Sequence, residues 1–350
     1  MNSKTDQLDD LLDITETNEF NIDDEYVGMR VDATLSKIIC NLSRTKITQY
    51  IKQGLILVNN KIVRPKDIVL GGELVTLHNI PENNTEEFIA EEIDLNIVYQ
   101  DDDVIVINKP AGIVTHPGNG NWTQTLLNGL IFAFPELKNL PRAGIIHRLD
   151  KDTSGLLVVA RTMIAYLSLI NQLQERTVNR IYRTIVEGSP HKEGVIKKNI
   201  GRDPQNRLRM KVLNFGGKEA ITYYRVLQYF DKFSYVECKL MTGRTHQIRV
   251  HMKSIGNPIV GDLVYNKLKT NYDDAINDAI ISLNRQALHA TKLSFVHPVS
   301  QEIMNFKIPL ANDFKYLLQV LYNKHNFEYN DLYDEDDEDD EHNWQIIYQL

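Results

Sequence analysis

Two sets of apolar residues at helical spacing occur near the N-terminus, and an alternating pattern follows them. The two sets are Leu35, Ile38, Ile39 and Leu42, then Ile47, Tyr50 and Ile51. Ser43 can cap the second helix and Gly54 can end it. The next stretch alternates and contains Asn59-Asn60 and Gly71-Gly72, which are typical of hairpin turns. Residues 28–77 are therefore predicted to form a helix–helix–β unit.

A polar segment separates this unit from a region of strand-like patterns. Residues 81–92, PENNTEEFIAEE, have no apolar period, which is typical of a linker. Strand-like runs follow: LNIVYQ, DVIVINK, LLVVA, RIYRTIVEG, EAITYYRVLQYF, FSYVECKLM and KLSFVHP. Helical patterns cover about 123–134, 162–175 and 311–325. Residues 93–325 are therefore predicted to form an α+β domain around a mixed, mainly antiparallel sheet.

Composition adds limits on the class of protein. The chain has 350 residues, of which 42% are hydrophobic and 25% charged, as in ordinary soluble proteins of one or two domains. No window approaches 18 uninterrupted apolar residues, and the acidic N-terminus is unlike a secretory signal, so no membrane association is expected. Cys40 and Cys238 fit no metal or redox spacing. A reduced, cytoplasmic setting follows from this cysteine usage.

The net charge of −8 is not spread evenly along the chain, because the acidic residues are concentrated near its two ends. Residues 1–25 and the run 334–341 each carry a net −8, so the rest of the chain carries +8. We expect residues 1–25 and 326–350 to be acidic, disordered tails, since like charges repel and cannot build a core. The basic body between them fits a polyanion partner, and a mildly basic globular body without such a partner is the alternative.

The segment HRLDKDTSG contains the first candidate for chemistry. Asp150 lies beside Lys151 and near Arg148, directly before an apolar strand, where a carboxylate could act as nucleophile or base. A turn or cap role is the alternative for Asp150, and it suits Asp152 better because Thr153 to Gly155 are turn formers. A glycosidase would use two carboxylates, but residues so close in sequence flank a sugar bond poorly.

Three further segments carry candidate residues. In GRTHQIRVHM, 243–252, one continuous strand could not aim all four basic side chains at one site, and Arg244 follows a glycine that can present it outward. The segment matches no zinc pattern, so no metal is expected. Tyr182 in NRIYRTIVEG is either a core residue or a ring for stacking on a base. Residues 197–211 are predicted to be a basic loop that contacts phosphate or is merely solvated.

The N-terminal unit resembles an S4 domain, a small RNA-binding module. The resemblance rests on the pattern RxDxxLxxxxxxxSRxxxxxxIxxGxIxVNxxxVxP. It implies that residues 26–80 dock structured RNA with the basic face of the helix pair, with contacts from Arg30, Arg44 and Lys46. A small α+β unit with solubilising lysines is the alternative, and eight basic residues against three acidic ones in 28–77 favour RNA.

The order of the motifs along the chain resembles the RluA family of pseudouridine synthases. The motifs are DDDVIVINKPAGIVTHPGNGN, HRLDKDTSGL, RxYxxxVxG, TGRTHQIRVHM and RQALHA, and the similarity runs from about residue 26 to 325. By this resemblance the chain is a cofactor-free enzyme with an S4 domain before a pseudouridine synthase domain. It would isomerise uridines in large-subunit ribosomal RNA, with the helix 69 loop as the expected target.

The resemblance also implies roles for individual residues. Asp150 matches the catalytic aspartate, Tyr182 matches a tyrosine that stacks on the target base, and Arg244 matches an arginine paired with the aspartate. Arg148 matches the arginine that fills the space left by the flipped uridine. Further substrate contacts are expected from His147, Arg202 and Arg207.

The expected partner is large-subunit ribosomal RNA or a ribosomal precursor particle, bound by a monomer, with neither cofactor nor metal. The same chemistry on other ribosomal or transfer RNA uridines is one alternative, and a non-catalytic RNA-binding assembly factor is another.

Overall fold

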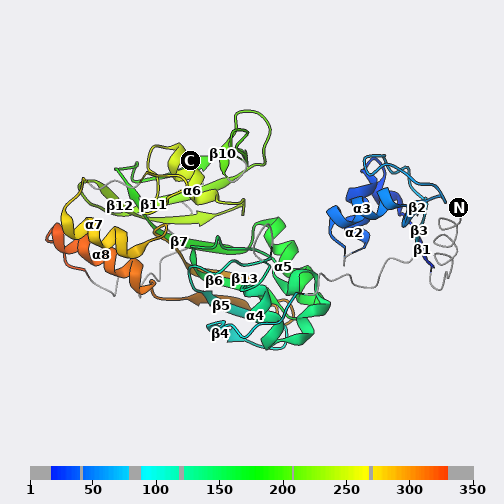
Figure 1. Ribbon diagram of the computed structural model, residues 1–350, viewed down its shortest axis with the longest axis horizontal. Coiled ribbons are helices and arrows are strands. Elements are labelled where there is room, and N and C mark those ends of the chain that lie inside the picture. The colour runs from blue at the N-terminus through cyan, green and yellow to red at the C-terminus, as the bar shows by residue number, and fades with distance from the viewer. Residues whose placement is uncertain are drawn as a thin grey trace, which may run out of the picture. The chain divides into compact units, whose positions relative to one another are not determined.

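The computed structural model consists of two compact units, Met1–Glu87 and Phe88–Leu350. Figure 1 shows the helices and strands of each unit. The structure describes residues 17–39, 42–78, 88–117, 122–206, 209–267 and 271–329. Within these ranges, no helix has both the length and the apolar character that crossing a bilayer requires.

Unit 1 packs two helices against a small antiparallel sheet of strand order β1-β3-β2. Its elements are β1 (Thr17–Asn21), a 3₁₀ helix (Asp24–Tyr26), α2 (Val31–Ile38), α3 (Arg44–Gln53), β2 (Ile56–Val58) and β3 (Leu74–His78). The Ser43 hydroxyl accepts a hydrogen bond from Lys46 N at 3.3 Å, and Gly54 ends α3 in the left-handed conformation. The predicted helix pair, the Ser43 cap and the end at Gly54 are confirmed, but α2 ends at Ile38, so Ile39 and Leu42 of the first apolar set lie beyond it.

The expectation of a disordered tail over residues 1–25 is wrong for its second half. Residues 17–21 form β1, which pairs antiparallel with β3, and Ile22 is buried in the core of unit 1. The apolar residues Phe20 and Ile22 alternate with polar ones, and backbone pairing at the sheet edge outweighs the repulsion among the acidic side chains. Residues 1–16 and 330–350 lie outside the described residues.

Unit 2 is built on one mixed sheet. Among the described residues, nine strands pair in the order β4-β5-β6-β13-β7-β12-β11-β8, with β14 on β13. Of the strand pairs that the structure describes in this sheet, only β6 with β13 is parallel. The strands are β4 (Ile97–Gln100), β5 (Val104–Lys109), β6 (Ser154–Ala160), β7 (Asn179–Glu187), β8 (Glu193–Lys197), β11 (Ile221–Tyr229), β12 (Phe233–Leu240), β13 (Leu288–Val296) and β14 (Ile303–Lys307). The predicted mixed, mainly antiparallel sheet is confirmed.

Helices cover both faces of the sheet near β5 and β6. The helices of unit 2 are α4 (Leu126–Ala133), α5 (Met163–Glu175), α6 (Gln247–Ser254), α7 (Asp274–Leu283) and α8 (Asn312–Lys324). Ile105 and Leu157 join the core that contains α4, whereas Val106 and Leu156 join the core that contains α5. Burial on both faces explains why these strands are continuously apolar in sequence. The pair α7 and α8 packs at the β12 end of the sheet (Figure 1).

The sequence patterns did not predict α6, α7, or the short strands β8 and β14. The prediction of a loop over residues 197–211 is also wrong, because β9 (Ile200–Arg202) and β10 (Met210–Val212) pair as a two-stranded ribbon. Each strand has three residues, too few for a periodic pattern to show. The ribbon packs on α6 through a small core of Ile200, Val250, Tyr265 and their neighbours.

Gly155 lies directly against the backbone of Ala290 in β13. Its φ of +116° is outside the range that other residues adopt readily, and a Cβ here would lie 2.2 Å from Ala290 O. Since β6 begins at Ser154, this approach fixes where the turn before β6 lies against the sheet. The turn contains Asp150, so the glycine sets the position of the candidate site.

We expect Gly155→Ala to lower the free energy of unfolding by about 3 kcal/mol or more, because the new methyl group meets backbone atoms of β13. Gly256→Ala is the matched control, since Gly256 also has positive φ but open space around its Cβ position. Denaturant unfolding of both variants measures the difference. Equal losses would show that backbone conformation, and not the close approach, sets the need for glycine at 155.

Candidate active site

Asp150 lies in the turn that enters β6. Its carbonyl oxygen accepts a hydrogen bond from Thr153 N at 3.1 Å, which closes the turn. The side chain is 15% exposed, and its Oδ2 accepts a hydrogen bond from Arg249 Nη1 at 3.0 Å. The carboxylate is thus held in place by Arg249 and remains partly exposed.

Arg249 is oriented by a second aspartate. Its Nε and Nη2 donate to Asp262 Oδ2 and Oδ1 at 2.8 and 2.9 Å, while Nη1 reaches Asp150. Burial acts to lower the pKa of Arg249, but hydrogen bonds and charge from Asp262 and Asp150 raise it overall. Arg249 is 5% exposed and the Asp262 side chain is fully buried. The two parallel hydrogen bonds to Asp262 set the orientation of the guanidinium. In this orientation Nη1 holds the carboxylate of Asp150 in place.

The expected pairing of Arg244 with Asp150 is wrong. Arg244 Nε donates instead to the backbone carbonyl of Glu219 at 3.0 Å. The reason is that the chain turns at His246, whose φ is +57°, and α6 begins at Gln247. The third residue of the helix, Arg249, therefore faces Asp150, and Arg244 stays on the preceding turn.

His246 and Tyr265 complete the surroundings of Asp150. His246 Nε2 lies 4.0 Å from Asp150 Oδ1, and Nδ1 lies 2.7 Å from the Tyr265 hydroxyl. That hydroxyl accepts a hydrogen bond from Met210 N, so its own hydrogen is available to Nδ1 and the ring hydrogen of His246 faces Asp150. Burial lowers the pKa of His246 although Asp150 opposes this, and burial raises the pKa of Tyr265 to about 12. Both groups are therefore neutral near pH 7.

Lys109 supports the same turn from inside the protein. Its ammonium group is fully buried and donates to the carbonyl oxygens of Pro110, Ile113 and Lys151 at 2.8 to 3.0 Å. Burial lowers its pKa to about 7, against the opposing charges of Asp150 and Asp152. Lys109 thereby ties the end of β5 to the residue after Asp150.

Tyr182 lies on β7, between β12 and β13. It is 5% exposed and belongs to the main core. Burial raises its pKa to about 12; nearby Arg180 opposes the shift and Asp150 adds to it. The hydroxyl is therefore protonated and neutral at neutral pH. Stacking of Tyr182 on a base stays a prediction.

His147 and Arg148 differ in environment although they are adjacent. His147 Nε2 accepts a hydrogen bond from Val158 N at 3.1 Å, and burial, together with the charge of Arg180, lowers its pKa to about 3. This neutral ring braces the turn against β6, so His147 acts in positioning. Arg148 is exposed and its charge reaches His246.

The remaining expected RNA contacts lie in both units. Asp32, 5% exposed in its side chain, accepts hydrogen bonds from Arg30 at 2.6 and 3.1 Å and from Arg44 at 2.8 Å. Burial acts to raise the pKa of Asp32, but Arg44 and Arg30 lower it. The two arginines, 41% and 50% exposed, are thus held in place while their surfaces face solvent.

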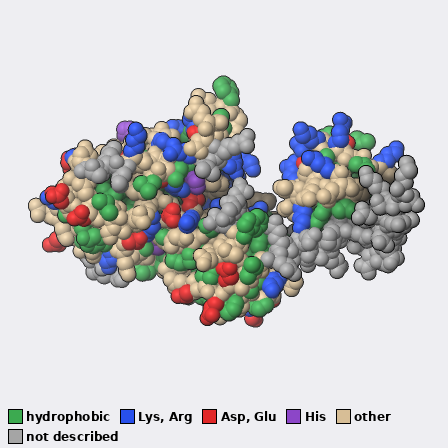
Figure 2. Space-filling view, viewed as in Figure 1, with side chains coloured by type: hydrophobic (Ala, Val, Ile, Leu, Met, Phe, Trp, Pro, Cys, Tyr) green, Lys and Arg blue, Asp and Glu red, His purple; other side chains and the backbone are tan. Residues whose placement is uncertain are grey.

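Lys46 is half-buried on α3 of the same unit, and Arg202 is exposed at the end of β9 in unit 2. Arg207 lies outside the described residues. Lys and Arg side chains are prominent on the visible face of unit 1 and around α6 and β10 of unit 2 (Figure 2).

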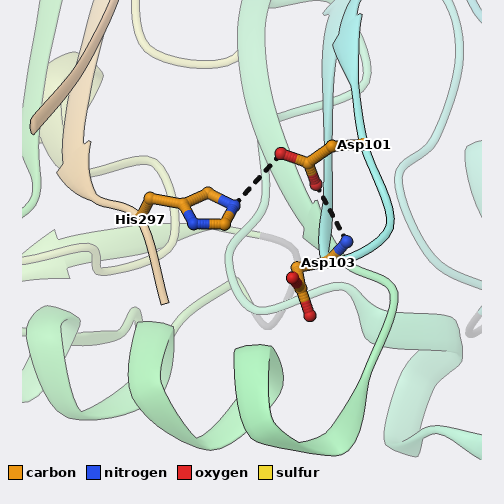
Figure 3. Close-up of side chains that lie close together, drawn as sticks. All are labelled: Asp101, Asp103 and His297. Atoms are coloured by element: carbon orange, nitrogen blue, oxygen red, sulfur yellow. Dashed lines mark hydrogen bonds and ion pairs between the residues drawn. The ribbon is translucent and has the colours of Figure 1, made fainter. Parts of the chain in front are cut away.

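Asp101, Asp103 and His297 are the group within the described residues that could suggest a metal site (Figure 3). His297 Nδ1 accepts hydrogen bonds from the backbone N–H groups of Val299 and Ser300, so Nε2 carries the ring hydrogen and donates it to Asp101 at 3.1 Å. Asp101 also accepts from Tyr99 and from backbone N–H groups. Asp103 Oδ1 accepts a hydrogen bond from Thr162 Oγ1 at 3.0 Å. These hydrogen bonds link the β4–β5 turn to the end of β13, which is a structural role for the cluster.

The sequence patterns missed Arg249, Asp262, Tyr265, His246 and Lys109 as parts of one site. The spacing of His246 and Arg249 did not predict which way their side chains point, because the sequence did not decide between a strand and a helix for residues 243–252. Asp262 and Tyr265 follow α6 in an irregular segment without any motif. A lysine at the end of the fully apolar strand DVIVINK was the one usable signal, since a buried lysine needs acceptors.

Comparison with known proteins gave two family models. A model described as RNA pseudouridylate synthase matches residues 103–254, and one described as S4 domain matches residues 29–75. The Ribosomal large subunit pseudouridine synthase D of Neisseria meningitidis serogroup B is 51% identical over 298 residues, which cover 85% of this chain and 80% of that protein. The protein of the same name from Nitrosomonas europaea is 46% identical over 307 residues, covering 88% of each.

A solved structure is also similar. Human RNA Pseudouridylate Synthase Domain Containing 4 superposes with a TM-score of 0.52 at 25% identity, covering 65% of this chain and 92% of that one.

Because buried, neutral histidines hold the turn, we expect the folded protein to lose stability in acid. His289 Nδ1 lies 2.8 Å from Ser154 Oγ at the start of β6, and burial lowers its pKa to about 4. The unfolded chain takes up a proton near pH 6.5 and the folded chain does not, so stability is lost as pH falls from 6.5 towards 4. We expect His289→Gln to reduce the loss between pH 6.5 and 5 by about 1–2 kcal/mol, measured by denaturant unfolding.

His191→Gln, at an exposed position of the same unit, is the control. An unchanged pH slope in His289→Gln would contradict the assignment of His289 as a buried neutral ring.

Proposed function

The chain belongs to the RluA family of RNA pseudouridylate synthases with an N-terminal S4 domain, and on this premise we propose that it converts uridines of large-subunit ribosomal RNA to pseudouridine. The enzyme class follows from the family. The ribosomal target is inferred from the names of the relatives, and within it we propose the helix 69 loop. The observation that supports the chemistry best is Asp150, fixed by Arg249 at 3.0 Å and open to solvent on one side.

The reaction needs a carboxylate close to the sugar of the target uridine. The N1–C1′ bond breaks, the base turns, and C5 bonds to C1′ while C5 loses its proton and N1 gains one. Asp150 can either bond to C1′ or remove a proton from the sugar as the base departs. Both routes require the same fixed carboxylate, and the pair of Arg249 with Asp262 supplies that fixation.

A uridine inside a stem-loop reaches Asp150 only after leaving its stack, at a cost of a few kcal/mol. We propose that Arg148, which is exposed two residues before Asp150, enters the vacated space. The negative charge of Asp150 contributes to the raised pKa of Tyr182, and the Tyr182 ring would stack under the extruded base. His246 would contact the nucleotide from the other side, since its Nε2 lies 4.0 Å from Asp150.

A glycosidase mechanism fits the site poorly. It requires a second accessible carboxylate near Asp150. Asp262 is the second carboxylate in contact with Arg249, but its side chain is fully buried and both oxygens are bonded to the guanidinium.

We expect Asp150→Asn to lower the rate of pseudouridine formation by about 1,000-fold or more, because an amide neither attacks nor accepts a proton. Transcribed large-subunit RNA is incubated with each protein, and pseudouridine is mapped by its chemical adduct. Asp152→Asn is the matched control, with the same chemical change two residues away. Rapid modification by Asp150→Asn would refute the catalytic assignment. RNA binding by wild type without any modification would support an assembly factor instead.

We further expect the double variant Arg44→Gln and Lys46→Gln in unit 1 to weaken RNA binding and to reduce the slope of log affinity against log salt by about 1.4–1.8. Each lost phosphate contact removes one released counterion. Binding of labelled RNA at several salt concentrations measures the slope. Lys324→Gln, which alters an exposed cation of unit 2, serves as control. If both proteins keep the wild-type slope, the proposed RNA contacts of Arg44 and Lys46 are wrong.

A further inference from the structure

Arg180 of β7 is a buried cation without a counterion. It is 6% exposed, and no hydrogen bond or ion pair to its guanidinium is found within the described residues. The other buried arginines of the described chain each have a carboxylate: Arg183 pairs with Glu237 at 2.9 Å, Arg249 with Asp262 at 2.8 Å and Arg285 with Asp313 at 2.6 Å. A buried charge left alone is unfavourable, so an anionic or strongly polar group from elsewhere is expected beside it.

The guanidinium lies where three motifs of the family meet. Arg180 and Tyr182 are two residues apart on one strand, so their side chains share a face of the sheet. Gly243 follows β12 and precedes Arg244, and a Cβ at Gly243 would lie 2.9 Å from Arg180 Nη1. The charge of Arg180 also acts on His147, next to Arg148. The unpaired cation is therefore adjacent to the residues proposed to receive the flipped nucleotide.

The ligand that fits this position is the uracil base. When the N1–C1′ bond breaks heterolytically, its electron pair stays on the base and the charge spreads from N1 to O2 and O4. A guanidinium donates hydrogen bonds to such oxygens and keeps its own protons throughout. When C5 bonds to C1′, C5 releases its proton and N1 takes one up, so the base is neutral again.

We propose that Arg180 is a further catalytic residue, which binds O2 or O4 of the flipped uracil and stabilises the negative charge that develops there. This inference rests on the proposed function. The fixed position of the cation in a site shielded from water makes it effective, because it does not need to reorganise as the charge appears. Tyr182 would hold the ring plane while Arg180 holds its oxygen edge. A side chain at position 243 would require the Arg180 guanidinium to shift from this position.

The test compares Arg180→Met and Arg180→Lys with wild type. Single-turnover rates at saturating RNA are measured by tritium release from C5-labelled uridine, and RNA affinity is measured separately. We expect Arg180→Met to bind RNA within about 3-fold of wild type and to react about 100-fold more slowly or worse. Arg180→Lys, which keeps the charge, should recover part of the rate. A fall in affinity with an unchanged saturating rate would place Arg180 on a phosphate and overturn the proposal.

Melting temperatures distinguish a catalytic role of Arg180 from a structural one. Removing an unpaired buried charge should leave the melting temperature of Arg180→Met unchanged or higher. Arg183→Met removes one of the two arginines that pair with the fully buried Glu237, and it should lower the melting temperature. If the melting temperatures of both variants fall equally and Arg180→Met reacts at nearly the wild-type rate, Arg180 has a structural role and the proposal is wrong.

RNA with 2-thiouridine or 4-thiouridine at the target gives a readout specific to the base. Sulfur accepts hydrogen bonds weakly, so one of the two substitutions should slow wild type while Arg180→Met responds to neither. If Arg180→Met does not fold, Arg180→Lys is compared with wild type on the same RNAs. Equal responses of variant and wild type overturn the proposal. Wild type that forms no pseudouridine at all instead refutes the proposed function, independently of Arg180.

Discussion

The double ion pair of Arg249 is the interaction on which the site depends. One guanidinium bonds Asp262 through two nitrogens and Asp150 through the third. Because Asp262 is fully buried, the arginine cannot turn away without leaving a charge unpaired in the interior. The carboxylate of Asp150 is thereby positioned before any substrate arrives, and substrate binding does not have to order it.

The rest of unit 2 serves to bring these three side chains together. Asp150 comes from the turn before β6, which Gly155, Lys109 and His289 hold against the sheet. Arg249 comes from α6, on the chain that follows β12. The parallel pairing of β6 with β13 sets the centre of the sheet, where β7 then places Tyr182 and Arg180. Residues far apart in sequence meet because strand order, not chain order, determines their distance.

The sequence predicted the parts of the fold that local signals control. The α2–α3 pair follows from apolar spacing, the Ser43 cap and Gly54, and the long strands follow from their apolar runs. The family motifs identified Asp150 and Tyr182 as candidates. They indicated Arg244 and not Arg249 as the partner of Asp150, since the observed pairing depends on the left-handed backbone of His246 and on Asp262, which lies 13 residues beyond Arg249. Neither feature has a local pattern in sequence.

The β9–β10 ribbon is linked to this site by a hydrogen bond whose donor is a backbone N–H group of the ribbon. The bond therefore does not depend on which side chain the ribbon carries at position 210. Met210 donates its backbone N–H to the Tyr265 hydroxyl, which in turn contacts His246 beside Asp150. Exposed side chains of the ribbon, such as Arg202 and Lys211, can therefore be exchanged while the tie is kept. The exposed surface of the ribbon can thus change while its contact with Tyr265, and through it with His246, is kept.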